Sequence, residues 1–185
     1  MKVESSERFF VLTGGPGSGK SALIEALRQS GHGASVEAGR GIIQDQVAIG
    51  GRALPWDDRA LFAEMMLCWE MRSHHMAQQQ TGLVFFDRGV PDVVAYLGLV
   101  GLPVPAHAQK AVEAFRYNRC VFIAPPWPEI FQQDRERKQD FDEAVRTYDA
   151  LVATYKPHGY ELVEIPRGPV EERVRFILQS VGTAS

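Results

Sequence analysis

The chain contains few cysteines and no excess of basic residues. Its two cysteines, Cys68 and Cys120, are far apart, and neither belongs to a Cys-x-x-Cys pair or to a Cys/His pattern with zinc-ligand spacing. Both lie in apolar stretches, so we expect two buried, reduced thiols. The 20 basic and 23 acidic residues give a net charge of −3, which argues against a general nucleic-acid-binding protein.

Long hydrophobic runs are also missing. No apolar run approaches the roughly 20 residues that a transmembrane helix needs. The polar segment 1–8 lacks the apolar region of a signal peptide. We therefore expect a cytoplasmic protein with no membrane partner. Because there is no low-complexity linker or internal repeat, residues 1–185 are expected to form a single domain, with flexible ends at 1–7 and 182–185.

Glycines cluster in one short segment near the N-terminus. Residues 14–21 read GGPGSGKS, a complete GxxxxGK[ST] motif. The apolar run before it favours a strand, and residues 21–28 after it have the composition of a helix. In that context backbone N–H groups and a helix N-terminus form a phosphate site. The predicted nucleotide-binding residues are Gly14, Gly15, Pro16, Gly17, Ser18, Gly19, Lys20 and Ser21.

The same motif predicts ATP and Mg²⁺ as ligands. Lys20 is expected to reach the β- and γ-phosphates, and the Ser21 hydroxyl is expected to bind Mg²⁺. The dinucleotide-binding fingerprint G-x-G-x-x-G is not completed, because positions 20 and 22 are Lys and Ala. A GTPase is disfavoured as well, since the guanine-reading Asn-Lys-x-Asp is absent and the only asparagine is Asn118.

Apolar segments that favour strands alternate with helical patterns along the chain. This alternation is typical of an α/β fold in which helices cover both faces of a parallel sheet. The longest predicted helix begins at Asp57 or Asp58 and runs toward Gln79; a second covers 142–155, and a third follows Pro169. A Met-rich stripe on the longest helix is interpreted as core, with a ligand pocket as the alternative. The predicted strands are Phe9–Thr13, Ala34–Ala38, Leu83–Asp87, Cys120–Ala124 and Glu161–Ile165.

An acidic and a basic residue stand at the end of the third predicted strand. Asp87 occupies the position at which phosphate-loop proteins place an acidic residue that holds Mg²⁺, directly or through water. The alternative is a cap for the helix near Pro91. Arg88 would lie in the crevice at the carboxyl edge of the sheet, where its guanidinium suits a phosphate or an acceptor. An ion pair with Asp92 is the alternative.

Glu37 ends the second predicted strand and is expected to face the same crevice. A carboxylate there could accept the proton of an acceptor hydroxyl as it attacks the γ-phosphate. Pairing with Arg40 or Arg88 in a structural role is an equally open alternative. The segment 50–56 and the helix after it are expected to shape the acceptor pocket.

A mixed-charge stretch, 134–138, follows the fourth predicted strand. We expect segment 127–141 to be lid-like and to bring Arg135 or Arg137 to the phosphates, because phosphoryl transfer needs positive charge and exclusion of water. A solvated helix face is the alternative. The five histidines lack metal-ligand spacing and receive no catalytic role.

With these motifs in place, the chain resembles a small family of phosphate-loop proteins, the AAA-like predicted ATPases. That family is akin to nucleoside and nucleotide kinases and to the ribosylnicotinamide kinase domain. The resemblance implies a three-layer P-loop NTPase fold with a five-stranded parallel sheet in the order 2-3-1-4-5. It also implies that Glu37 matches the base of deoxynucleoside kinases, Asp87-Arg88 their acidic-Arg pair, and Arg135-x-Arg137 their lid. It rests on GGPGSGKS, Glu37-Ala38-Gly39-Arg40, Asp87-Arg88-Gly89, Trp127 and Phe141.

The expected function is a Mg²⁺-dependent kinase that transfers the γ-phosphate of ATP to an unidentified small-molecule acceptor, nucleoside-like or another hydroxyl compound. An ATPase that acts as a nucleotide-dependent regulatory switch with a protein partner is the alternative. The expected metal ligands are Ser21 and Asp87. The expected catalytic residues are Lys20, Glu37, Asp87, Arg88, Arg135 and Arg137.

Overall fold

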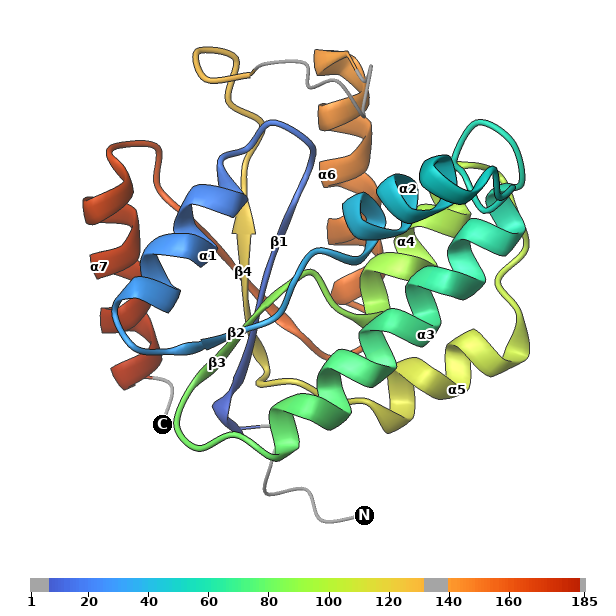
Figure 1. Cartoon of the computed structure of the whole chain (residues 1–185). Helices are drawn as coiled ribbons and strands as arrows, with labels where there is room; N and C mark the ends of the chain where they lie inside the picture. The colour runs from blue at the N-terminus through green and yellow to red at the C-terminus, as the bar shows by residue number, and fades with distance from the viewer. Residues whose placement is uncertain (1–6, 132–139, 184–185) are drawn as a thin grey trace.

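A computed structural model describes residues 7–131 and 140–183, which form a five-stranded parallel sheet with helices on both faces (Figure 1). The strands lie in the order β2-β3-β1-β4-β5, so the predicted α/β fold and strand order are confirmed. In chain order the elements are β1 (Phe9–Gly14), α1 (Lys20–Gln29), β2 (Gly33–Ala34), α2 (Ala38–Ile49), α3 (Arg59–Gln78), β3 (Val84–Asp87), α4 (Val90–Leu99), α5 (Ala106–Ala114), β4 (Cys120–Ala124), α6 (Phe141–Tyr155), β5 (Glu161–Glu164) and α7 (Val170–Thr183).

Two hydrophobic cores lie on opposite faces of the sheet. Along β1 the side chains alternate between them, as the two-residue period of a strand requires. Phe9 and Val11 pack in the core beneath α3, α4, α5 and α6, whereas Phe10 and Leu12 pack in the core beneath α1 and α7. Since β1 is central and buried on both faces, the loop at its carboxyl end has a rigid support.

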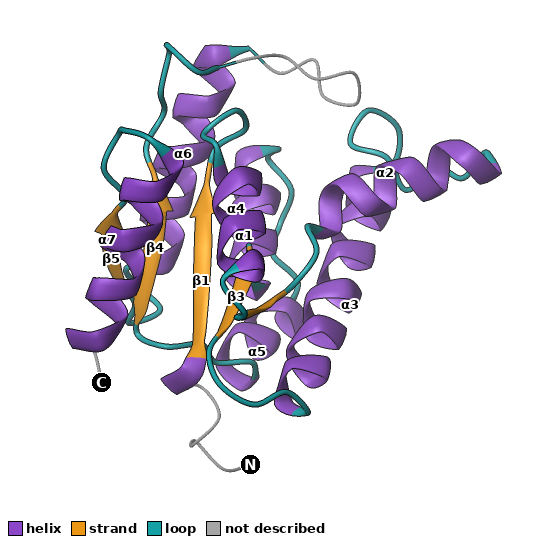
Figure 2. Ribbon diagram, turned by 60° about the vertical axis from the view of Figure 1, so that its left-hand side comes forward, coloured by secondary structure: helices purple, strands orange, loops and turns teal. Residues whose placement is uncertain are grey.

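A smaller apolar cluster joins α2 to α3. It contains Ala38, Ile42 and Ile43 of α2, Leu54 of the following loop, and Phe62 of α3. Through this cluster α2 is anchored although it extends outward, away from the sheet (Figure 2). The arrangement leaves room between α2, α3, α4 and α6 at the carboxyl edge of the sheet.

The predicted second strand is too long. β2 covers only Gly33–Ala34, and α2 begins at Ala38, so Glu37 precedes a helix and does not end a strand. The pairing is interrupted by a side chain, because the Ser35 Oγ accepts a hydrogen bond from the Asp87 N–H over 2.9 Å. The composition of 34–38 favours a strand, and it carries no sign of this side-chain bond.

The helix ends are close to the predictions. Asp58 is the N-cap of α3, and its Oδ1 accepts a hydrogen bond from the Leu61 N–H over 3.0 Å. Asp140 caps α6 in the same way, accepting from the Glu143 N–H over 2.7 Å. α7 continues through Thr183, beyond the point at which the sequence suggests a flexible end.

The expectation of two buried thiols is right for Cys120 and wrong for Cys68. Cys120 is buried at the start of β4, whereas Cys68 is exposed on the outer side of α3. Apolar residues occupy both sides of α3, so helical periodicity did not separate its inner face from its outer one. Within the described ranges, none of the helices combines the length and apolarity needed to cross a membrane.

Candidate active site

The glycine-rich loop joins the carboxyl end of β1 to the first turn of α1. Gly17 (φ 69°) and Gly19 (φ 79°) adopt left-handed backbone conformations, which glycine tolerates without strain. Gly17 also lies against the Phe131 ring, since a Cβ at Gly17 would come within 2.6 Å of Phe131 Cδ2. The loop leads directly into the N-terminus of α1, and the partial positive charge of this helix end favours an anion.

The side chain of Lys20 folds back into this loop. Its Nζ donates to the carbonyl oxygens of Gly14 and Gly15, both over 2.9 Å, and to Ser18 Oγ over 3.2 Å. Ser21 follows in the first turn of α1 and is exposed. The ammonium group and the hydroxyl are thus placed at the helix N-terminus, where the motif predicts phosphate and Mg²⁺ contacts.

Arg173 of α7 supports the loop from behind, and the sequence analysis did not single it out. Its Nη2 donates to the Ser18 carbonyl oxygen over 3.1 Å, and its Cζ lies 5.5 Å from the Trp127 ring centroid. The side chain is buried, so its pKa is lowered by desolvation. Its Nε has no hydrogen-bond partner in the described part of the chain. The spacing of apolar residues on α7 gives no signal for this arginine.

Asp87 ends β3 beside Leu12 of β1. Its carboxyl group is buried, and Oδ1 has no hydrogen-bond partner among the described residues. Burial raises the pKa of Asp87, and the neighbouring Glu37 carboxylate raises it further, whereas Lys20 and Arg88 act in the opposite direction. A buried carboxylate oxygen without a donor is suited to a cation.

Arg88 adopts a left-handed backbone (φ 74°), an uncommon conformation for a residue with a side chain. Its Nη1 lies 3.2 Å from Asp92 Oδ1, and its Nε lies 3.5 Å from Glu37 Oε1. Burial by itself would lower the pKa of Arg88, but the carboxylates of Glu37, Asp92 and Asp87 raise it above its ordinary value. The ion pair with Asp92 considered from the sequence therefore exists, and it is enclosed in the protein.

Asp92 connects four parts of the structure, whereas from the sequence it was expected only as a possible partner of Arg88. Its Oδ1 accepts a hydrogen bond from Thr13 Oγ1 of β1 over 2.6 Å. Its Oδ2 accepts from the Gly89 N–H over 3.1 Å and from Tyr155 Oη of α6 over 2.5 Å. These bonds hold the first turn of α4, and with it Arg88, in a fixed position relative to β1.

Glu37 lies at the start of α2, with 11% of its side chain exposed. Besides its contact with Arg88, its Oε2 is 3.9 Å from Arg40 Nε. Both structural pairings considered from the sequence are present. The carboxylate also lines a cavity, which is the placement that a base would need.

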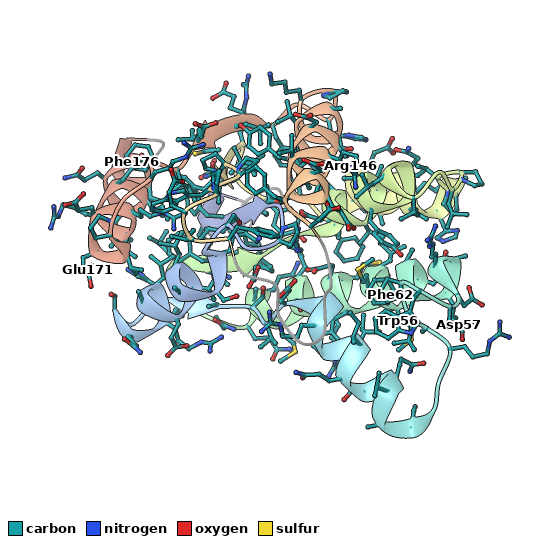
Figure 3. All side chains as sticks on the ribbon, turned by 90° about the horizontal axis from the view of Figure 1, so that it is seen from above. Trp56, Asp57, Phe62, Arg146, Glu171 and Phe176 are labelled. Atoms are coloured by element: carbon teal, nitrogen blue, oxygen red, sulfur yellow. The ribbon has the colours of Figure 1, made fainter. Side chains whose placement is uncertain are left out.

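This cavity, of about 260 Å³, lies between the phosphate loop and helices α2, α3, α4 and α6. Pro16 of the loop lines it, together with Trp56 and with Phe62 and Met66 of α3. Part of the Met-rich stripe thus faces a pocket, and the segment before α3 helps to shape it. Figure 3 looks down on this end of the molecule and shows Trp56 and Phe62 on one side, with Glu171 and Phe176 of α7 on the other.

The predicted phosphate contacts of Arg135 and Arg137 lie outside the described residues and stay predictions. The residues that flank this stretch meet, since the ring centroids of Phe131 and Phe141 are 5.6 Å apart. In the part of the chain that is described, no cluster of three or more His, Cys, Asp or Glu forms a metal site. The donors that fit Mg²⁺ are the Ser21 hydroxyl and the unpaired Asp87 Oδ1, since Mg²⁺ needs few protein ligands beside nucleotide phosphates.

A comparison with protein-family models matches residues 9–173 to the family described as AAA domain. A comparison with curated proteins finds no match.

Several solved structures share this fold at low sequence identity. A crystal structure of NadR protein in complex with NR has 16% identity and a TM-score of 0.71, and it covers 96% of this chain and 50% of that one. This chain therefore spans about half the length of NadR. Deoxyadenosine kinase from M. mycoides has 12% identity, a TM-score of 0.63 and coverage of 95% and 99%. Thymidylate kinase from Ehrlichia chaffeensis has 14% identity, a TM-score of 0.61 and coverage of 94% and 97%.

Proposed function

This chain belongs to the AAA domain family, and on that premise we propose that it is a Mg²⁺-dependent kinase. It would transfer the γ-phosphate of ATP to a hydroxyl of a nucleoside-like acceptor. The observation that carries the proposal is the position of the cavity: Pro16 of the phosphate loop lines it together with Glu37 and Arg88. An acceptor in this cavity would lie beside phosphates bound on the loop, an arrangement that favours transfer over hydrolysis.

In the proposed reaction, an acceptor oxygen attacks the γ-phosphorus while the bond from that phosphorus to the terminal oxygen of ADP breaks. Glu37 accepts the proton of the attacking hydroxyl. Lys20 leaves the loop carbonyls to contact the β- and γ-phosphates, and Arg88 places a fixed positive charge beside the transferring group. Arg88 suits this role because its left-handed backbone and its carboxylate partners hold it at the cavity wall.

Ser21 and Asp87 are the residues that would hold Mg²⁺. When bound, the ion would offset negative charge on the β- and γ-phosphates. Asp87 is suited to bind a cation because its Oδ1 is buried and has no hydrogen-bond donor among the described residues.

The test measures ATP consumption and phosphate transfer with Mg²⁺, using nucleosides, nucleoside monophosphates and ribosylated vitamins as acceptors. We expect one acceptor class to stimulate ATP consumption and to become phosphorylated. Lys20→Ala should abolish transfer. Glu37→Gln should lower kcat by about 10²–10⁴-fold, the usual contribution of a general base, while nucleotide affinity is kept.

Glu113→Gln, at an exposed position of α5, is the matched control and should behave as the unchanged protein. The proposed kinase function would be contradicted if ATP were hydrolysed slowly and at the same rate with every compound, and if Glu37→Gln left that rate unchanged. That result would instead support the regulatory ATPase.

A further inference from the structure

Three side chains that line the cavity each carry a buried polar atom with no hydrogen-bond partner among the residues the structure describes. These atoms are Oε2 of Glu70 on α3, Oη of Tyr96 on α4 and Oγ1 of Thr147 on α6. Glu70 is only 2% exposed. Buried polar atoms without partners cost stability and are uncommon, so three of them on side chains around one cavity need an explanation. A bound molecule that pairs with them supplies one.

Aromatic side chains stand beside these atoms. Phe62 and Tyr96 pack edge to face, with their ring centroids 5.5 Å apart. Trp56 lines the same cavity and is 58% exposed. Such surfaces bind flat rings, while the neighbouring polar atoms fix the orientation of the ring.

The charges around the cavity disfavour an anion as acceptor. The described lining residues include four acidic side chains and a single basic one, Arg88. Arg88 is already paired with Glu37 and Asp92. Even without a charge on Glu70, the three other carboxylates outnumber the one guanidinium, so a phosphate group on the acceptor would meet a net negative lining, and like charges oppose binding. The acidic lining residues are Glu37, Glu70, Asp92 and Glu143.

We propose that the acceptor is a nucleoside, or a similar ribosylated ring, that carries no phosphate group, and that Glu70, Tyr96 and Thr147 bind its polar groups. Glu70 is the specificity-determining residue of this set, since it lies deepest in the protein among the three. The inference deepens the proposed kinase function and rests on it. It separates this chain from enzymes that phosphorylate nucleoside monophosphates.

The ionisation of Glu70 agrees with this role. Burial raises its pKa well above the usual range, and the carboxylates of Asp92 and Asp87 raise it further, while Arg88 opposes them. A carboxyl group that keeps its proton offers one O–H donor and one carbonyl acceptor. This pair is complementary to an amide-like edge of a ring, where an N–H stands next to a C=O.

The first experiment measures binding directly, by isothermal titration calorimetry in the presence of a non-hydrolysable ATP analogue. The probes are adenosine, cytidine, thymidine and ribosylated nicotinamide, each compared with its 5′-monophosphate. We expect at least one nucleoside to bind about 100-fold more tightly than its monophosphate. Tighter binding of the monophosphates, or no binding of any nucleoside, would overturn the inference.

The second experiment removes the three unpaired polar atoms one at a time, with Glu70→Met, Tyr96→Phe and Thr147→Val. Without added nucleoside, each variant should be at least as stable as the unchanged protein, because the substitution deletes an unpaired polar group. Each should nevertheless weaken nucleoside binding by about tenfold or more, because the bound polar group loses its partner. Glu70→Gln keeps a donor and an acceptor, so its affinity should stay within about threefold.

Glu64→Met is the matched control, since Glu64 lies on the solvent side of α3 with 46% of its side chain exposed. Unchanged nucleoside affinity in all three variants would overturn the inference. If a nucleoside binds as expected and is not phosphorylated, the kinase function fails while this acceptor site stands.

Discussion

Arg88 Nη1 donates to Asp92 Oδ1 over 3.2 Å, and the ion pair is enclosed, with 16% of the Arg88 side chain and 7% of the Asp92 side chain exposed. Asp92 accepts further hydrogen bonds from Thr13 and Tyr155. Arg88 is therefore tied through one carboxylate to β1, which leads into the phosphate loop, and to α6, whose Ala144 lies beside Gly15 of that loop. This relationship links the stability of the fold to the position of a charge at the candidate site.

Replacing Asp92 by Ala should destabilise the protein strongly. The substitution removes a partner of a buried guanidinium and leaves the hydroxyl groups of Thr13 and Tyr155 without their acceptor. Loss of one partner of a buried ion pair typically costs about 3–5 kcal/mol. Urea unfolding measures the change, and Asp149→Ala at an exposed position of α6 is the control. Adding Arg88→Met should recover part of the loss, and strictly additive effects would contradict the coupling.

Arg173→Met should weaken nucleotide binding indirectly, through the loop that Arg173 supports. The substitution deletes the hydrogen bond to the Ser18 carbonyl oxygen and the positive charge behind the loop. We expect the Kd for ATP to rise about tenfold, which corresponds to about 1.4 kcal/mol. Fluorescence titration with a labelled nucleotide measures it. Arg175→Met, an exposed arginine of the same helix, should leave the Kd unchanged, and equal effects of the two variants would count against this role.

The fold could be predicted from the sequence because its signals are local and repeated. Three of the five strands, β1, β3 and β4, are built on continuous apolar runs, and GGPGSGKS identifies the turn between β1 and α1. The second strand was misjudged because a tertiary contact, the hydrogen bond between the Ser35 hydroxyl and the Asp87 backbone, interrupts its pairing. No local pattern contains that contact.

The candidate site was predictable only where a motif or a strand end marks it. Lys20, Ser21 and Asp87 lie where the loop and strand patterns put them. Glu70 and Arg173 were missed because each stands in an ordinary helical pattern and differs from a surface residue only by its burial. Burial of a charged residue depends on which helix faces meet, and periodicity cannot show this when a helix such as α3 is apolar on two sides.

Two glycines should respond to alanine in opposite directions. At Gly17 the backbone is left-handed and a Cβ would meet the Phe131 ring at 2.6 Å, so Gly17→Ala should destabilise the protein by about 1–2 kcal/mol and weaken nucleotide binding. Gly98 lies inside α4, and nothing stands within 4 Å of its missing Cβ. Gly98→Ala should therefore stabilise by about 0.5–1 kcal/mol. Thermal unfolding of both variants decides the matter, and a shift of the same sign in both would contradict the prediction.

Glu70→Gln should make the protein more stable, and increasingly so as the pH rises. The folded-state pKa of Glu70 is raised, so above its ordinary value of 4.5 the unfolded chain loses this proton while the folded protein keeps it. Stability of the unchanged protein then falls by about 1.4 kcal/mol per pH unit until the folded-state pKa is reached, and the amide variant lacks this loss. The charged or titratable groups that act on Glu70 or feel its charge are Asp92, Asp87, Arg88, Glu37 and Tyr117.

Urea unfolding at about pH 5, 6, 7 and 8 measures this difference in the free energy of unfolding between the two proteins. The difference in the free energy of unfolding should be smallest at the lowest pH and should increase as the pH rises. It should become constant once Glu70 is also ionised in the folded protein. Glu113→Gln, exposed on α5, should show no comparable trend. A constant difference across the range would mean that Glu70 is ionised in the folded protein throughout. In that case the carboxyl group could not act as a hydrogen-bond donor toward the acceptor, and only its accepting oxygens would remain for recognition.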